Sequence, residues 1–219
     1  MATSLFSPDL ISPSVASELP EGYTLRPLQK SDHAEFLSVL TVLTKVGDIS
    51  FETWSARYDW MAARNDEYFI TVIENDEKKV VAVGSLFIER KLLLPPPPPP
   101  PTPVLLMSLH LHTRTLADGG GVDSIRGCSS VGHIEDIAVA ADQQGKKLGL
   151  RIIQALDDIA QRVGCYKSIL DCSEKNQGFY EKCGFKHAGV QMVRCYRRGC
   201  SCFDFVFELL GLILIGALL

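Results

Sequence analysis

The chain has 219 residues, of which 46% are hydrophobic and 22% charged, and its formal net charge is −4. These proportions are ordinary for a globular protein with a full hydrophobic core, and the length predicts one domain. The acidic balance argues against a nucleic-acid partner, because nucleic-acid-binding proteins present a basic face. The 7 cysteines include no CxxC pair. We therefore expect no metal site and no disulfide framework, and a reducing, cytoplasmic location fits best.

Residues 1–20 are rich in Ser and Pro and lack the basic and apolar regions of a secretory signal. They are predicted to form a loosely attached N-terminal arm. Residues 23–28 then read as a short strand, with Pro27 marking an edge or an end. The aromatic residues Tyr23, Trp54 and Trp60 are interpreted as core.

Two helices are predicted next, the first capped by Ser31-Asp32 and the second by Ser50. Their expected apolar faces are Phe36, Leu37, Leu40 and Leu43 in the first helix, and Trp54, Tyr58 and Met61 in the second. The segments 68–74 and 79–90 are typical of two strands that form a hairpin.

The composition changes abruptly after Lys91, where prolines occupy 95–101 and glycines 119–121. Consecutive prolines impose polyproline II and cannot donate to a sheet. Because so long a connection is outside the usual loop lengths, 92–130 is predicted to be an atypical, disordered insert. The C-terminal tail, 197–219, is apolar, but its uninterrupted run is about half of the ~20 residues that span a bilayer. Membrane contact through this tail is not expected.

The stretch 132–184 organises the rest of the chain. A predicted strand, 133–140, runs into a glycine-containing turn at 144–149 and then into a helix that ends near Val163. This order presents free amide groups to a phosphate at a helix N-terminus. Beyond it we expect a strand at 167–172, a short helix at 176–183 and a last strand at 185–196. The whole order predicts an α/β fold with a mixed central sheet and helices on both faces.

Several motifs in this stretch occur together: G-H-I-E-D-I-A-V (132–139), Q-G-K-K-L-G (144–149), G-C-Y-K (164–167), L-D-C (170–172) and N-Q-G-F-Y-E-K-C-G-F (176–185). In combination they resemble the GNAT acetyltransferase superfamily and, more narrowly, fungal glucosamine 6-phosphate N-acetyltransferases. Two departures stand out. Lys147 replaces the usual inner glycine of the turn, and the insert replaces a short lysine-containing segment of the family's sugar-phosphate pocket, leaving Arg90 and Lys91 at its start.

The resemblance implies the GNAT fold over 21–196 and direct transfer of acetyl from acetyl-CoA to glucosamine 6-phosphate in a ternary complex, without a metal. It also implies a homodimer and a role in UDP-N-acetylglucosamine biosynthesis. Two alternatives remain open at this point. The chain could acetylate another small amine, or the insert could have destroyed the sugar pocket and left a catalytically impaired GNAT-fold protein.

Acetyl-CoA needs donors for its pyrophosphate, which the turn amides offer, and Lys146 or Lys147 would add charge. In the family, a backbone N–H near Ile137 or Val139 bonds the thioester oxygen. The implied acetyl-CoA-binding residues are Ile137, Val139, Gln144, Gly145, Lys146, Lys147, Leu148, Gly149, Asn176 and Phe179. Asn176 is also expected to cap its helix.

Glu135 is the first choice for general base, because adjacent strand residues point to opposite faces and only one of Glu135 and Asp136 can face a pocket. Asp136 would orient the amine or contact across a dimer, and Asp171 resembles the family's sugar- or amine-contacting acid. Tyr180 resembles the residue that protonates the departing thiolate, a task that suits a phenol. The alternative for the acids is a solvated or structural role, and for Tyr180 it is core packing.

A nucleophilic Cys172 is disfavoured, since no histidine neighbours it in the sequence. Cationic side chains such as Lys182 could also contact the substrate phosphate. The implied substrate-binding residues are Lys91, Glu135, Asp136, Lys167, Asp171 and Arg194.

Overall fold

A computed structural model of the chain describes residues 4–92 and 129–192. It divides into a unit within 1–170 and a second unit within 171–219. The first unit is built on a five-stranded sheet in the order β1-β2-β3-β4-β5, antiparallel except for the parallel pair of β4 and β5. The strands are β1 (Thr24–Pro27), β2 (Tyr68–Glu74), β3 (Val80–Lys91), β4 (Ser129–Val139) and β5 (Cys165–Ile169).

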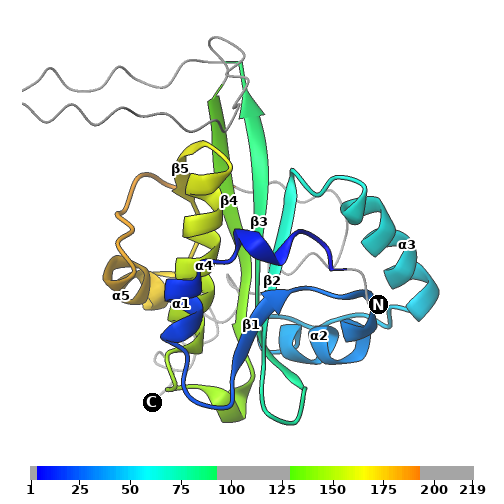
Figure 1. Cartoon of the computed structure of the whole chain (residues 1–219). Helices are drawn as coiled ribbons and strands as arrows, with labels where there is room; N and C mark the ends of the chain where they lie inside the picture. The colour runs from blue at the N-terminus through cyan, green and yellow to red at the C-terminus, as the bar shows by residue number, and fades with distance from the viewer. Residues whose placement is uncertain (1–3, 93–128, 193–219) are drawn as a thin grey trace, which may run out of the picture. The chain divides into compact units, whose positions relative to one another are not determined.

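Helices cover both faces of this sheet, so the predicted mixed α/β architecture is confirmed. Helix α4 lies along one face with α1 beside it, and α2 and α3 lie on the other side (Figure 1). The helices of the first unit are α1 (Pro13–Ser17), α2 (His33–Leu40), α3 (Phe51–Ala62) and α4 (Leu148–Arg162), with short 3-10 turns η1 (Pro8–Leu10), η2 (Lys30–Asp32) and η3 (Ala141–Gln143).

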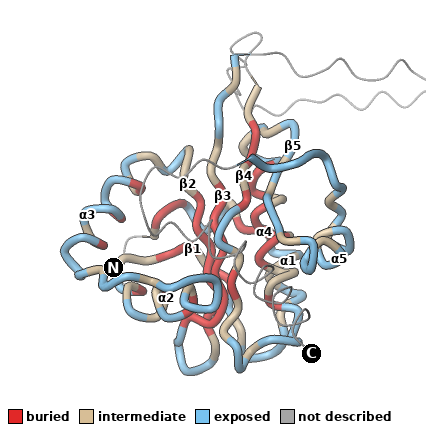
Figure 2. The backbone as a smooth tube through the Cα atoms, turned by 180° about the vertical axis from the view of Figure 1, so that it is seen from behind, coloured by how far each residue is buried: buried red, intermediate tan, exposed pale blue. Residues whose placement is uncertain are grey.

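A large part of the core lies between the sheet and α4, and Figure 2 shows burial concentrated in the central strands and along this helix. Buried side chains of α2 and α3 pack on the other side of the sheet. The predicted stripe of α4 is confirmed at Ile152, Leu156 and Ile159, each 0% exposed. Its fourth predicted member, Val163, lies beyond the helix end and is only half-buried. The hairpin of β2 and β3 and the Ser50 cap of α3 are also confirmed, and the Ser50 hydroxyl accepts from Thr53 N at 3.2 Å.

The N-terminal segment is part of this core, so the prediction of a loosely attached arm is wrong for its apolar residues. Leu5 and Phe6 are 1% and 3% exposed. The Leu5 amide donates to Leu28 O at 2.9 Å, and the Phe6 ring meets Phe69 edge-on at 5.3 Å. Burial of these two apolar side chains stabilises the packing of the segment on the sheet, although the residues around them are polar.

Predictions on the apolar side chains near α2 and α3 need correction. In α2 the buried residues are Phe36 and Val39, whereas Leu43 follows the helix end and is 48% exposed. Trp60, predicted as core, is 40% exposed because it lies on the outer face of α3 under Arg64, whose guanidinium is 4.0 Å from the ring centroid. Tyr23, also predicted as core, is only half-buried.

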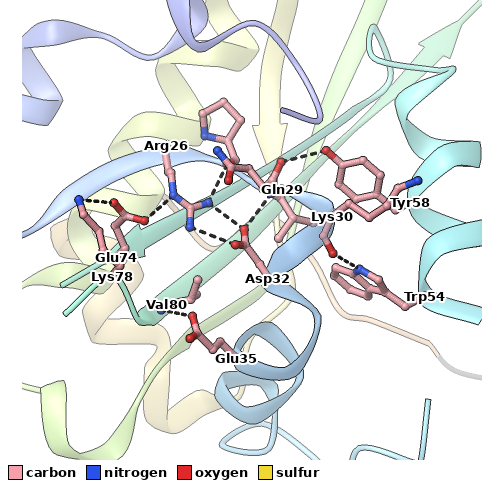
Figure 3. Close-up of polar contacts among 12 residues, drawn as sticks. Arg26, Gln29, Lys30, Asp32, Glu35, Trp54, Tyr58, Glu74, Lys78 and Val80 are labelled. Atoms are coloured by element: carbon pink, nitrogen blue, oxygen red, sulfur yellow. Dashed lines mark hydrogen bonds and ion pairs between the residues drawn. The ribbon is translucent and has the colours of Figure 1, made fainter. Parts of the chain in front are cut away.

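A buried polar cluster joins β1, β2 and the start of α2 (Figure 3). The Arg26 guanidinium bonds Asp32 Oδ2 at 2.8 Å and Glu74 Oε2 at 2.7 Å. Asp32 is the N-cap residue of α2, as predicted, but its side chain makes no capping bond. Instead, the carboxylate holds Arg26 and accepts from Gln29 N at 2.8 Å. Burial alone would raise the pKa of Glu74, but hydrogen bonds from Arg26 and Lys78 outweigh it and lower that pKa.

The second unit contains α5 (Glu174–Lys182), which is closed by Gly184 in the left-handed region at φ 95°. The predicted last strand is wrong for residues 185–192, which form no strand there, and 193–196 lie outside the described residues. The apolar side chains of Val190 and Met192 are 86% and 89% exposed. A strand needs a paired neighbour and a covered face, and residues 185–192 have no ladder partner among the described residues.

Other boundaries also shift. The predicted strand at 167–172 ends at Ile169, where its pairing with His133 of β4 stops. The insert is shorter than predicted at its end, because Ser129 and Ser130 already belong to β4. The rest of the insert and the tail 197–219 lie outside the described residues. None of the helices in the described ranges is long and apolar enough to cross a membrane.

Candidate active site

The two acids of β4 lie at a β-bulge. Val83 of β3 pairs with Ala138 and Ser85 with Glu135, so Asp136 and Ile137 together face Gly84. Asp136 has a φ of 54°, in the left-handed region that non-glycine residues rarely adopt. The regular alternation assumed for Glu135 and Asp136 therefore does not hold here. A bulge leaves its extra residue outside the ladder, which frees backbone groups at this point.

Both acidic residues have much of their surface exposed. Crowding around the Asp136 carboxyl nevertheless desolvates it and raises its pKa. A carboxylate with a raised pKa accepts a proton more readily near neutral pH. This shift favours a proton-accepting role for Asp136.

The glycine-containing turn follows β4, as predicted, and α4 begins within it, at Leu148. Gly145 and Lys147 have φ values of 83° and 62°. In the part of the chain that the structure describes, the amides of 145–149 have no hydrogen-bond acceptor. They stand at the positive end of a 15-residue helix, which suits a phosphate. The left-handed backbone of Lys147 also explains why glycine is usual at this position.

A charged cluster that sequence reasoning missed lies on β3 and β4. The carboxylate of Glu89 forms ion pairs with Lys91 and with His133 Nε2, the second at 2.8 Å. Hydrogen bonds from Lys91 and then His133 lower the pKa of Glu89. Because Phe87 pairs with His133, and alternate residues share a face, the cluster lies on the same face as Glu135. The i, i+2 spacing of Glu89 and Lys91, and of His133 and Glu135, was the signal that could have found it.

Lys167 lies on β5, where it pairs with Val131 of β4. Its side chain is exposed, with Nζ 5.5 Å from the Tyr166 ring centroid. The first unit thus holds four of the predicted substrate-binding residues, Lys91, Glu135, Asp136 and Lys167, on the adjacent strands β3, β4 and β5.

The second unit holds the remaining described candidates. The Asp171 carboxylate accepts from Gln191 Nε2 at 2.7 Å. Asn176 does not cap α5 as predicted, since the N-cap is Ser173 and Asn176 lies inside the first turn. Phe179 is 40% exposed. Arg194 lies outside the described residues.

Tyr180 stands between two aromatic rings, with Phe179 at 5.2 Å and Phe185 at 6.3 Å. Burial raises its pKa, and the thiols of Cys172 and Cys183 raise it further. The phenol therefore keeps its proton at neutral pH and can act as an acid. Among residues 4–92 and 129–192, no group of three or more His, Cys, Asp or Glu side chains could hold a metal ion.

A bulged acidic strand, followed by a turn that presents unpaired amides at a helix N-terminus, forms a site that can hold a phosphate group beside a proton acceptor. The acetyltransferase (GNAT) family model matches residues 35–185. The chain belongs to this family.

Named relatives indicate which members of the family this chain resembles. The chain is 42% identical over 176 residues to the glucosamine 6-phosphate N-acetyltransferase of Candida albicans, a match that covers 80% of this chain and 97% of that protein. It is 35% identical to glucosamine 6-phosphate N-acetyltransferase 1 of Dictyostelium discoideum, over 81% of this chain and 94% of that protein. The crystal structure of the Arabidopsis thaliana enzyme matches with a TM-score of 0.63 at 31% identity, and covers 81% of this chain and 100% of that one.

Proposed function

We propose that this chain transfers the acetyl group of acetyl-CoA to the amine of glucosamine 6-phosphate, which gives N-acetylglucosamine 6-phosphate. The observation that carries the proposal is the pair Glu135 and Asp136 at a bulge, directly before a turn whose amides have no acceptor in the described residues. Relatives of this chain that are named for the same reaction support the choice of substrate.

The turn amides and the cations of Lys146 and Lys147 would hold the phosphates of acetyl-CoA. In the first unit neither lysine forms an ion pair with a described carboxylate, so both charges are available to an anion. A free backbone amide at the bulge, near Ile137 or Val139, would bond the thioester oxygen as it gains negative charge.

The two acidic residues of β4 then remove the proton from the amine. Asp136 or Glu135 accepts it as the nitrogen attacks the thioester carbonyl carbon, and the carbon–sulfur bond breaks. Tyr180 gives its proton to the departing thiolate, so that both products leave neutral at these atoms. The raised pKa of Asp136 suits a proton acceptor, and Tyr180 is protonated at neutral pH and so carries the proton that the thiolate needs.

The cluster of Lys91, Glu89 and His133 supports a phosphate-binding end of the sugar site. Glu89 holds the Lys91 ammonium and the His133 imidazole on the face that carries Glu135. Lys167, Asp171 and Arg194 complete the proposed substrate contacts, together with a homodimer that would cover the exposed Val190 and Met192. We further propose a cytoplasmic enzyme of UDP-N-acetylglucosamine biosynthesis with its acetyltransferase domain at 21–196.

The pairing of β3 with β4 supports an active rather than an impaired product. The ladder is kept as far as Lys91 with Ser129, so the chain leaves and re-enters the hairpin at one end. The bulge lies seven residues further along β4, roughly 23 Å away at ~3.3 Å per residue. The acids and the turn therefore keep their register despite the insert.

An amine panel tests the substrate. Product formation is measured by mass spectrometry for glucosamine 6-phosphate, glucosamine and other small primary amines, with the full chain and with a variant in which a Gly-rich turn joins Leu92 to Ser129. We expect kcat/KM to fall roughly 10²-fold or more without the phosphate, because charge-assisted bonds to it are lost. Preference for another amine would contradict the proposal, and activity of the shortened variant alone would show that the insert disables the pocket.

A further inference from the structure

Tyr23, just before β1, makes a polar contact with the phosphate-binding turn more than a hundred residues later in the chain. Its hydroxyl donates to Gln143 Oε1 at 2.6 Å and accepts from Lys146 Nζ at 2.7 Å. The ammonium of Lys146 also donates to Gln143 Oε1 at 2.8 Å. Three side chains thus close a ring of three hydrogen bonds.

The ring of hydrogen bonds also fixes the position of the Lys146 side chain. Lys146 Nζ is 5.3 Å from the centroid of the Tyr23 ring, within the range of a cation–π contact. Gln143 ends the 3-10 turn η3 and donates from Nε2 to Asp142 at 2.8 Å. The Gln143 side-chain amide is therefore oriented at both its oxygen and its nitrogen. The Tyr23 phenol oxygen and the Gln143 amide oxygen together hold the Lys146 ammonium in one place.

Both direct partners of Lys146 are neutral groups. The acceptors are a phenol and an amide, and no carboxylate in the described ranges forms an ion pair with this lysine. Its charge is thus held in position but is not neutralised. A free lysine side chain loses much rotamer freedom when it binds a ligand, and a side chain that is already held loses less.

We propose that Tyr23 is a positioning residue for the binding of acetyl-CoA. The Tyr23 hydroxyl holds Lys146 at the turn, so that the Lys146 ammonium contacts the phosphates of the coenzyme. The inference rests on the proposed use of acetyl-CoA but not on the identity of the amine. The hydroxyl is the essential group, because Phe at position 23 would keep the ring and lose both hydrogen bonds.

Calorimetric titration of the full chain with CoA and with pantetheine, which carries no phosphate, tests the proposal. We expect Tyr23→Phe to raise the dissociation constant for CoA about three- to tenfold, the usual effect of losing a bond to a charged group. The dissociation constant for pantetheine should stay unchanged. Lys146→Met should weaken CoA binding at least as much, and the double variant should be no weaker than Lys146→Met alone.

Tyr68→Phe is the matched control, because its ring packs between Trp60 and Phe87 on another part of the sheet. Melting temperatures establish that each variant is folded. Unchanged CoA affinity in Tyr23→Phe would overturn the proposal, as would an equal loss for CoA and pantetheine, which would indicate a general structural role. Failure of the unaltered chain to bind CoA would instead contradict the use of acetyl-CoA itself.

Discussion

Gly84 of β3 lies so close beneath Ile152 of α4 that a Cβ on the glycine would stand 2.3 Å from Ile152 Cγ2. The same atom would be 2.7 Å from Ile137 Cδ1, on the bulge that faces Gly84. Glycine at this position therefore sets both the depth of α4 on the sheet and the place of the bulge.

Gly84→Ala should destabilise the chain by about 1–3 kcal/mol, the usual cost of overpacking a core, and should lower kcat because Ile137 must move. Urea denaturation and initial rates check the two effects. Gly47→Ala is the control, because nothing lies within 4 Å of a Cβ there. Equal stability of the two variants would contradict the close approach.

Lys147 combines a strained backbone with a charge that the proposed mechanism uses. A non-glycine residue at its φ of 62° costs about 1 kcal/mol. Lys147→Gly should therefore raise the melting temperature by about 2–4 °C and weaken CoA binding. Lys147→Ala removes the charge but keeps the strain, so it should weaken CoA binding without the gain in stability. A raised melting temperature in both Lys147→Gly and Lys147→Ala would show that the charge of Lys147, and not its backbone strain, limits stability here.

Arg26 compensates two buried carboxylates, since the side chains of Asp32 and Glu74 are 7% and 10% exposed. Arg26→Met should cost about 3–5 kcal/mol in urea denaturation at neutral pH, because it leaves Asp32 without its cation and Glu74 with only the exposed Lys78. Lys79→Met breaks the exposed pair with Glu77 and should cost less than about 1 kcal/mol. Similar costs in the two variants would contradict the compensating role.

The lowered pKa of Glu74 makes stability depend on pH. Its ordinary value is 4.5, and the folded value lies below it, so the unfolded chain binds the proton more tightly. The contribution is complete above pH 4.5 and is lost as the pH falls through the folded pKa. Glu74→Gln should therefore flatten the loss of stability below pH 4.5, as measured by thermal melts across that range. An unchanged acid profile would contradict this assignment.

Tyr180→Phe removes the proposed proton donor but keeps the ring between Phe179 and Phe185. We expect kcat to fall roughly 10²-fold or more, while the affinity for CoA stays the same. Since the pKa of Tyr180 is raised above its usual 10.0, this phenol stays protonated up to that pH and should cause no loss of rate below it. A wild-type kcat in the variant would assign the proton transfer to another group.

Periodicity and turn chemistry predicted much of this fold. The stripe of α4, the hairpin of β2 and β3 and the turn before Leu148 all follow from local patterns. The prediction of a last strand was wrong because a strand depends on a neighbouring strand that lies elsewhere in the sequence. The packing of Leu5 was missed for the same reason, since its burial depends on contacts that are distant in sequence.

The candidate site could be predicted in its residue types but not in its geometry. Motifs pointed to Glu135, Asp136 and the turn, yet the left-handed φ of Asp136 arises from pairing with β3. No local pattern links Tyr23 to Lys146, because 122 residues separate them in the chain. Such contacts depend on how the strands assemble.

The central claim is acetyl transfer to glucosamine 6-phosphate, and the most direct measurement is the initial rate of CoA thiol release by the purified full chain. We predict release from acetyl-CoA that requires glucosamine 6-phosphate, saturates with it, and falls sharply in Asp136→Asn. A folded chain that binds CoA but releases no thiol above the sugar-free background would contradict the account.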